Sequence, residues 1–390
     1  MRTVLLQEIC DLQIGKTPSR SVPAYWGGQL PWVTISDFSA GRFVTTTKER
    51  ITQLGAAKSG SKCIPRGTLL LSFKLSLGKR TISGCDVFTN EAIAALHILD
   101  HNAADRDYLY WALGSIDYDR LVDRAAKGKT LNKAKLKVLR IPLPPLAEQK
   151  RIAGILDAAD ALRAKRREAL AQLDTLIQST FLDMFGDPVT NPMGWKERSL
   201  GELAQGGFRN GLSPSTKGTF DGEVLTLSAI TRGRFDFAAR RDARFDKRPS
   251  LSQKLNIGTF LICRGNGNRN LVGTGTYPDR SSNRVCFPDT MIGVTIDPAT
   301  LTAAYLQRVW RTRGVRRQIE RGARTTNGTH KVNQRLLSSI VFPVPPADLQ
   351  LHFAAIVESI EKQGAIQRAH LAELDNLFAS LQSRAFRGDL

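Results

Sequence analysis

The chain has 390 residues, a formal net charge of +20, and 42% hydrophobic against 24% charged residues. This length predicts two to four domains, each large enough to bury its own core, and the composition argues against a disordered or fibrous chain. No apolar run reaches the roughly 18 residues of a membrane-spanning helix, and the N-terminus lacks a signal-peptide pattern. We therefore expect a cytoplasmic protein without a membrane partner.

Residues 1–143 form the first predicted domain, of mixed α/β type. Residues 67–73 are a short apolar run after a turn, which predicts a buried strand. A polar, basic loop follows this strand, and such loops on a rigid core are frequent recognition sites. A second basic stretch precedes the next predicted helix. The candidate recognition residues in this domain are Lys74, Lys79, Arg80, Lys127, Lys129 and Lys133.

Residues 144–187 are predicted to be one long helix. Pro144-Pro145 cannot lie inside a helix and marks its start, and Gly186 marks its end. Apolar side chains recur with 3-4-3-4 spacing, the heptad pattern of paired helices. The residues expected to pair the helices are Ile152, Ile155, Leu162, Leu173 and Leu176.

Residues 188–344 form a second mixed α/β domain. Residues 258–263 predict a buried strand, again followed by a polar, basic loop. Arginine and lysine contact phosphates or read guanine, and asparagine reads adenine, so the loop combines both chemistries. The candidate DNA-contacting residues are Arg264, Asn266, Asn268, Arg269, Asn270, Arg321, Arg324 and Lys331.

Residues 345–390 repeat the first helical segment at a constant offset of 201 positions. Without a gap, 15 of 48 aligned positions are identical between residues 141–188 and 342–389. The corresponding pairing residues are Phe353, Ile356, Ile360, Leu374 and Leu377. The sequence therefore predicts an α+β fold with a pseudo-two-fold tandem repeat: two mixed α/β domains joined by two long antiparallel helices in a coiled coil.

The basic excess lies outside the two helices. Residues 1–140 carry a net charge of +9 and residues 191–341 of +14, whereas the two helical segments carry −1 and −2. Together with a pI near 10.1, this distribution favours nucleic-acid binding by both domains. The alternative is a basic surface that only aids solubility.

The repeated segments also resemble a known family. Residues 141–152 (Ile-Pro-Leu-Pro-Pro-Leu-Ala-Glu-Gln-Lys-Arg-Ile), 67–72, 186–195 and 385–390 are similar to segments of the specificity (S) subunits of type I restriction–modification systems. The resemblance implies two target recognition domains that each read half of a split site in double-stranded DNA. It also implies docking of two methylation subunits on the helices, followed by restriction subunits. The second Pro-Pro segment departs from the pattern at residues 347–352.

We expect no catalytic or metal-binding residues in this chain. Five cysteines, an odd number without a Cys-x-x-Cys pair, favour reduced thiols, and the histidines have no metal-ligand spacing with them. The resemblance implies that S-adenosylmethionine, ATP and Mg²⁺ are bound by the partner subunits. Two alternatives remain open at this point: a stand-alone DNA methyltransferase or nuclease, and a sequence-blind DNA-bridging scaffold.

Overall fold

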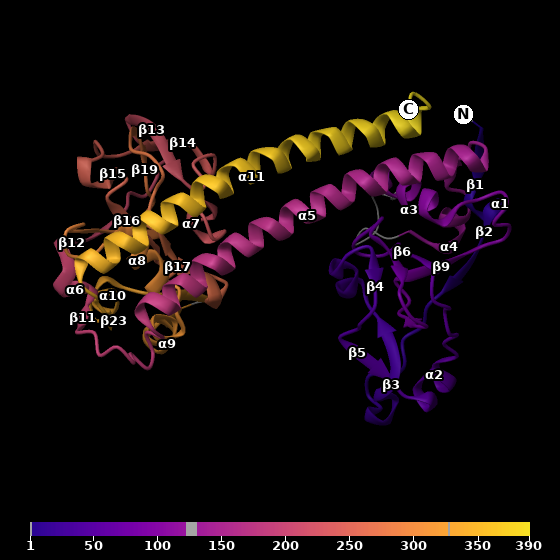
Figure 1. The fold of residues 1–390 in the computed structure, drawn as a ribbon, viewed down its shortest axis with the longest axis horizontal. Helices are drawn as coiled ribbons and strands as arrows, with labels where there is room; N and C mark the ends of the chain where they lie inside the picture. Colours follow the sequence, from indigo (N-terminus) through magenta and orange to yellow (C-terminus); the bar gives the residue numbers. More distant parts are fainter. Residues whose placement is uncertain (1, 122–130, 327) are drawn as a thin grey trace. The chain divides into compact units, whose positions relative to one another are not determined.

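The computed structural model describes residues 2–121, 131–326 and 328–390 (Figure 1). The chain divides into two units: unit 1 comprises Met1–Arg167 with Ala369–Leu390, and unit 2 comprises Glu168–Arg368. Each unit contains one α/β domain and part of each of two long helices, α5 (Leu146–Phe185) and α11 (Ala347–Arg387). The α+β fold class predicted from the sequence is confirmed, and the units are described in turn.

The domain of unit 1 is built on a five-stranded sheet of order β2-β9-β6-β7-β4 and a three-stranded sheet of order β5-β3-β8. A separate pair, β1 with β10, leads into α5. The predicted strand over residues 67–73 is β6, whose four residues are all buried between β9 and β7. The strands are β1 (Thr3–Leu5), β2 (Cys10–Ile14), β3 (Trp26–Val33), β4 (Phe43–Val44), β5 (Glu49–Ile51), β6 (Leu69–Ser72), β7 (Arg80–Ser83), β8 (Phe88–Thr89), β9 (Ile93–Ile98) and β10 (Arg140–Pro142).

Short helices cover the sheets of unit 1. The described α-helices of this domain are α1 (Leu6–Ile9), α2 (Gln53–Ser59), α3 (Arg106–Gly114) and α4 (Lys133–Lys137), and the 3₁₀ helices are η1 (Pro23–Tyr25), η2 (Ile35–Ala40) and η3 (Tyr118–Leu121). Polar caps start three of them: the side chains of Thr52, Asp105 and Asn132 accept hydrogen bonds from the amides of Gly55, Tyr108 and Lys135. The main core of the unit joins this domain to α5 and to the end of α11.

The domain of unit 2 contains two four-stranded sheets, β12-β20-β16-β18 and β14-β13-β19-β15, and a three-stranded sheet of order β17-β22-β21. The pair β11 with β23 takes the place that β1 with β10 has in unit 1. The strands are β11 (Glu197–Ser199), β12 (Ala204–Asn210), β13 (Phe220–Leu225), β14 (Arg240–Phe245), β15 (Lys254–Leu255), β16 (Thr259–Cys263), β17 (Gly265–Asn266), β18 (Gly275–Thr276), β19 (Ser282–Cys286), β20 (Met291–Ile296), β21 (Arg324–Thr326), β22 (Thr329–Lys331) and β23 (Val341–Pro343).

The helices of this second domain repeat the capping pattern of the first. They are α6 (Leu200–Leu203), α7 (Ser228–Thr231), α8 (Ala303–Val309), α9 (Arg313–Gly322) and α10 (Gln334–Ser338), with 3₁₀ helices η4 (Leu251–Gln253) and η5 (Arg269–Leu271). Thr302 caps α8 and Asn333 caps α10, as Asp105 and Asn132 cap α3 and α4. Tyr305 donates a hydrogen bond to the carbonyl of Pro343 at 2.7 Å, the same bond that Tyr108 makes to Pro142. The tandem repeat therefore extends into the two domains.

Both long helices begin at the residue directly after their Pro-Pro pairs, at Leu146 and Ala347. The two helices predicted from the sequence are therefore confirmed. Within each unit the segments of α5 and α11 run antiparallel (Figure 1). In unit 1, Arg163 near the middle of α5 pairs with Asp375 of α11 at 2.6 Å. In unit 2, Phe181 near the end of α5 contacts Phe353 near the start of α11, with 5.7 Å between ring centroids.

The buried face of each helix differs from the predicted heptad seam. Ile152 and Phe353 are buried as the seam requires, whereas Leu162, Leu176 and Leu377 are 53%, 48% and 50% exposed. The helices bury other residues against the domain cores instead: Leu156, Ile177, Phe181, Phe185, Phe378 and Ala385. These residues lie outside the predicted heptad pattern because each helix also packs on a globular domain, so part of its buried face is turned toward that domain.

Candidate nucleic-acid interface

The small sheet β17-β22-β21 in unit 2 brings together two basic segments that are far apart in the sequence. β17 lies in the predicted loop after β16, and Gly265 and Asn266 pair with Lys331 and His330 of β22. β22 in turn pairs with β21, which places Arg324 opposite Lys331. The loop at 264–270 and the stretch at 321–331, predicted separately, therefore form one surface.

Side-chain hydrogen bonds to the backbone fix the loop at 264–270. The side-chain oxygen of Asn266 accepts from the amide of Asn268 at 2.8 Å, and that of Asn268 accepts from the amide of Asn270 at 3.0 Å. These local bonds use the side-chain oxygens of Asn266 and Asn268, as is common for asparagine in turns. Asn268, Arg269 and Asn270 are exposed, so their remaining donors and acceptors face solvent.

Arginine side chains tie this loop to its surroundings. Arg264 is half-buried and donates to the carbonyl of Asp289 at 3.1 Å, and Arg269 donates to the carbonyl of Glu320 at 3.3 Å. Arg316 of α9, which the sequence analysis did not single out, donates to the carbonyls of Arg269 and Val272, both at 2.6 Å. Arg316 also forms an ion pair with Glu320 at 2.7 Å. It therefore holds the recognition loop against α9.

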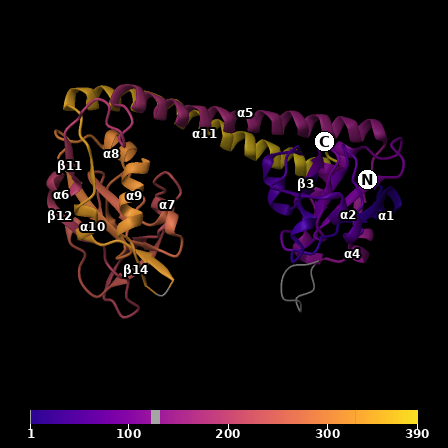
Figure 2. The ribbon, with the colours of Figure 1, turned by 90° about the horizontal axis from the view of Figure 1, so that it is seen from below.

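The remaining predicted residues of unit 2 lie on the same side of that unit. Arg321 is in the last turn of α9, Arg324 begins β21, and Lys331 ends β22; all three are exposed. Figure 2 shows the β21–β22 hairpin on the side of unit 2 away from the two long helices. Cations at the free end of a domain can reach a partner without interference from its helices.

Unit 1 has a related arrangement. The amide of Leu131 donates to the carbonyl of Phe73 at 2.9 Å, as the amide of Val332 donates to the carbonyl of Arg264 in unit 2. This bond brings the stretch before α4, with exposed Lys133 at its first turn, close to the loop after β6. Lys127 and Lys129 lie outside the described residues, so their placement stays a prediction.

The three predicted cations in the loop after β6 have different environments. Lys79 is exposed, and the ammonium of half-buried Lys74 is 5.6 Å from the Phe73 ring centroid. The guanidinium of Arg80, in contrast, lies 4.6 Å from the ring centroid of Tyr110 and 5.6 Å from that of Trp111. Burial lowers the pKa of Arg80. This position inside the domain favours packing on α3 over a DNA contact for Arg80.

A second basic surface of unit 2 was missed in the sequence. Arg241 and Arg244 of β14 and Arg284 of β19 are exposed and line a groove of about 750 Å³ with residues 214–216. Arg244 is 3.6 Å from Asp221, and within the described chain Arg241 and Arg284 have no ion pair or side-chain hydrogen bond. The basic run 240–248 was the available signal, but it did not show which arginines share a face.

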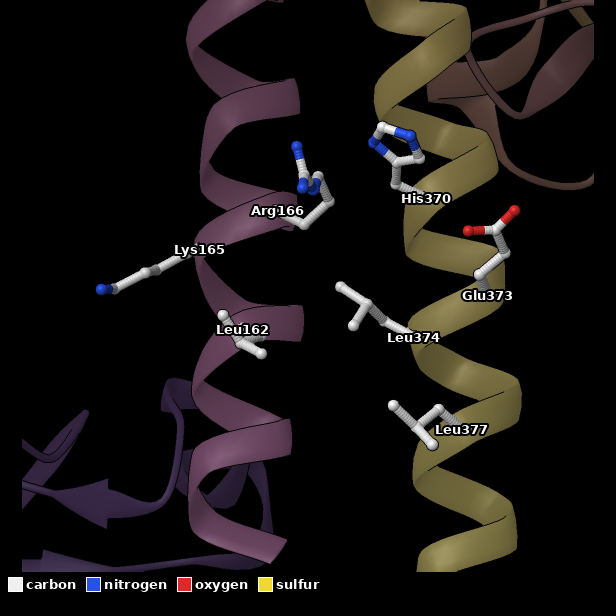
Figure 3. Close-up of a pocket in the computed structure, with 7 residues that line it drawn as sticks. All are labelled: Leu162, Lys165, Arg166, His370, Glu373, Leu374 and Leu377. Atoms are coloured by element: carbon white, nitrogen blue, oxygen red, sulfur yellow. The ribbon is translucent and has the colours of Figure 1, made fainter. Parts of the chain in front are cut away.

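The helices of unit 1 leave an apolar groove between them. It is lined by Leu162, Lys165 and Arg166 of α5 and by His370, Glu373, Leu374 and Leu377 of α11, with a volume of about 690 Å³. Figure 3 shows Leu162, Leu374 and Leu377 on the sides of the helices that face each other, whereas Lys165 points away. Of the other predicted pairing residues, Ile155, Leu173, Ile356 and Ile360 are half-buried.

Among the described residues, no group of three or more histidine, cysteine, aspartate or glutamate side chains is close enough to share a metal ion. Over the same residues, every helix is too short or too polar for a membrane span.

The family model named "Type I restriction modification DNA specificity domain" matches residues 1–172. The MjaIX specificity subunit of Methanocaldococcus jannaschii is 25% identical over 218 residues, which are 51% of this chain and 50% of that one. The EcoKI specificity subunit of Escherichia coli is 26% identical over 299 residues, which are 70% of this chain and 63% of that one. The matches thus span about half to two thirds of these curated relatives.

Solved structures share the whole fold. The S subunit of the type I restriction–modification system of M. genitalium has a TM-score of 0.56 at 15% identity, over 99% of this chain and 96% of that one. A chain from a type I restriction–modification complex has a TM-score of 0.54 at 18% identity, over 100% of this chain and 98% of that one. In sequence and in fold, the chain is similar to the specificity subunits of type I restriction–modification systems.

Proposed function

We propose that this chain is the non-catalytic DNA-recognition subunit of a type I restriction–modification complex. Residues 1–143 and 188–344 are the two target recognition domains, and residues 144–187 and 345–390 are the spacer and docking helices. Each domain reads one half of a two-part site in double-stranded DNA. Because the two domains differ in their loops, we expect two unlike half-sites.

One observation carries the proposal: in unit 2, two separately predicted basic segments meet on the β17-β22-β21 sheet. Exposed arginine, lysine and asparagine side chains share this surface, which lies on the side away from the helices (Figure 2). Phosphate contacts position a protein on DNA, and base contacts give it specificity. We assign phosphate contacts to Arg321, Arg324 and the groove arginines Arg241 and Arg284, and base contacts to Arg269 and Asn270.

The helices supply the proposed docking surface for two methylation subunits, which then recruit restriction subunits. Leu162 and Leu377 remain half-exposed beside the groove in unit 1. Exposed apolar surface of this kind is typical of sites that a partner covers. In this proposal, S-adenosylmethionine, ATP and Mg²⁺ are held by those partners, and this chain contributes sequence recognition alone.

Mapping of methylated bases tests the proposal. A host that carries this chain with type I methylation subunits should modify one two-part sequence throughout its genome, and a host that lacks the chain should not. Modification without sequence preference would support a sequence-blind scaffold instead. Methyl transfer or cleavage by the purified chain, given S-adenosylmethionine, Mg²⁺ and DNA, would support a stand-alone enzyme.

A further inference from the structure

An eleven-residue segment occurs once in each domain and ends in Gly-Arg-Phe. Residues 33–43 align with 225–235 without a gap, so that Arg42 corresponds to Arg234. The local structure is repeated as well: the hydroxyls of Thr34 and Ser36 are 2.8 Å apart, and so are those of Thr226 and Ser228.

The glycine of each Gly-Arg-Phe turn has a backbone conformation that other residues rarely adopt. Gly41 has a φ of 117° and Gly233 a φ of 87°. Both turns follow a short helix, η2 or α7, and each presents its arginine to a long helix of its own unit.

Arg42 connects the domain of unit 1 to α5. Its guanidinium forms ion pairs with Asp157 of α5 and with Asp107 of α3, the latter at 2.7 Å. Asp157 also accepts a hydrogen bond from the indole of Trp111 at 2.7 Å. The Arg42 side chain is only 20% exposed, so water screens these contacts weakly.

Arg234 connects the domain of unit 2 to both long helices. Its two terminal nitrogens contact the two carboxylate oxygens of Glu361 in α11, at 2.9 and 3.1 Å. Asp174 of α5 is 3.7 Å from the same guanidinium. The paired arrangement fixes the orientation of the two groups and is stronger than a single contact.

The helix repeat explains why an arginine of the domain pairs with the carboxylates of the long helices in unit 2. In unit 1, Arg163 within α5 pairs with Asp160 at 2.9 Å and with Asp375 at 2.6 Å. The equivalent carboxylates in unit 2 are Glu361 and Asp174, but Gly364 stands where Arg163 would be. Arg368 of α11 lies 3.5 Å from Glu361, and Arg234 adds a second cation from the recognition domain.

We propose that Arg42 and Arg234 are positioning residues that fix each recognition domain on its stretch of the helix pair and so restrict the spacing between the two half-sites. The inference rests on the proposed function. One additional base pair moves a half-site by about 3.4 Å along the DNA and rotates it by about 35°. A domain held by a paired ion contact cannot follow this change, whereas a loosened domain can.

The test selects binding sites for the full-length chain from a random double-stranded DNA library. The wild type should select one spacing between its half-sites. Arg234→Ala should reduce the preference for that spacing over its neighbours by about two- to fivefold, the size expected for a half-exposed, bidentate ion pair. The bases selected within each half-site should not change, which separates positioning from a general loss of structure.

Matched variants keep the test decisive. Arg232→Ala removes an exposed arginine two residues away, which has no ion pair or side-chain hydrogen bond in the described chain, and should leave the spacing unchanged. The charge exchange Arg234→Glu with Glu361→Arg should restore a single spacing, even if Arg234→Ala lowers the melting temperature. Arg42→Ala should loosen the spacing, and Arg66→Ala should not.

Two failures are distinguishable. A wild type that selects no two-part site overturns the proposed function and the positioning role with it. A wild type with one spacing, together with a folded Arg234→Ala that keeps the same preference, overturns the positioning role alone. Altered bases in a half-site would also count against it, because they would assign Arg234 to DNA contact.

Discussion

The side chains of Gln149 and Gln350, equivalent residues of the helix repeat, make the same hydrogen bonds in their separate units. Gln149 accepts from the amide of Asp105 at 2.8 Å, and Gln350 accepts from the amide of Thr302 at 2.9 Å. Each amide group donates to two backbone carbonyls, one of them in its own Pro-Pro segment. Both side chains are fully buried. Each glutamine therefore joins the start of a long helix to the cap of a helix in its domain.

Replacing Gln350 with Leu should destabilise the protein, because leucine keeps the volume and leaves one amide and two carbonyls without partners. We expect a loss of about 1–3 kcal/mol in unfolding free energy, measured as a lower midpoint in urea. Gln363→Leu on the exposed face of α11 is the matched control and should change the midpoint little. An unchanged midpoint for Gln350→Leu would mean that these bonds are replaced by water.

Much of the architecture followed from the sequence, because the signals are local. The Pro-Pro pairs and the repeat predicted α5 and α11, and apolar runs after turns predicted β6 and β16. The loop after each predicted strand lies beside the basic stretch before the next long helix, although the two were predicted as separate features. These features depend on backbone preferences and on spacing, which one sequence contains.

The remaining errors concern side-chain direction, which depends on tertiary packing. The heptad pattern omits Phe181 and Phe378, because these side chains are buried against the domain cores and not against the other helix alone. Arg80 was expected in solvent, but Tyr110 and Trp111 of a later helix cover it. A basic residue after a strand can be exposed to solvent or covered by side chains of a later element, and the sequence alone does not distinguish the two.

The cysteines should react in an order set by exposure. Cys63 is exposed, whereas Cys10, Cys263 and Cys286 are buried. Burial raises the pKa of Cys263 to about 11 and that of Cys10 to about 12, and the reactive form is the thiolate. A disulfide reagent at pH 8 should therefore modify Cys63 rapidly in the native protein and the buried thiols only after unfolding. Rapid modification of Cys10, Cys263 or Cys286 in the native protein, located by peptide mapping, would contradict this order.

The same raised pKa values predict a loss of stability in alkali. Below pH 9, the ordinary thiol pKa, both the folded and the unfolded states keep the protons on Cys10 and Cys263. Between pH 9 and 11 the unfolded state releases them and the folded state does not, so the unfolding free energy falls as pH rises. The double variant Cys10→Ala with Cys263→Ala should show a smaller decrease in urea midpoint from pH 8.5 to 10.5 than the wild type.

Arginines in the two basic surfaces of unit 2 should contribute to affinity for all DNA sequences. Two double variants test this: Arg321→Ala with Arg324→Ala, and Arg241→Ala with Arg284→Ala. In each, the negative slope of log affinity against log salt concentration should become less steep by up to about 1.8, at about 0.9 per phosphate contact. The bases preferred should stay the same. Lys150→Ala on α5 makes a charge change in the other unit and should preserve the slope. Binding titrations at several salt concentrations decide between these outcomes.

Asn270 should affect the choice of base. It is exposed, and its backbone amide is held by the side chain of Asn268, so its side chain is presented from a fixed turn. If it reads adenine through two hydrogen bonds, Asn270→Ala should reduce discrimination at one position of one half-site by about 1–3 kcal/mol. Asn102→Ala, in an exposed turn of unit 1, should not. Equal losses on every DNA sequence would move Asn270 to the group of phosphate contacts.

The apolar groove of unit 1 should matter for assembly and not for DNA binding. Leu162 and Leu377 are each about half-exposed. Burial of the remaining apolar surface of each side chain by a docked methylation subunit would therefore contribute roughly 1 kcal/mol to the binding free energy. Leu162→Glu with Leu377→Glu should therefore weaken the complex by about 2 kcal/mol, roughly thirtyfold in dissociation constant. Leu54→Glu makes the same change on a 49% exposed leucine of α2, and should leave both affinities unchanged. Calorimetric titration with the methylation subunit, beside DNA binding by each variant alone, measures the two effects separately; wild-type affinity in the double variant would exclude the groove as a docking surface.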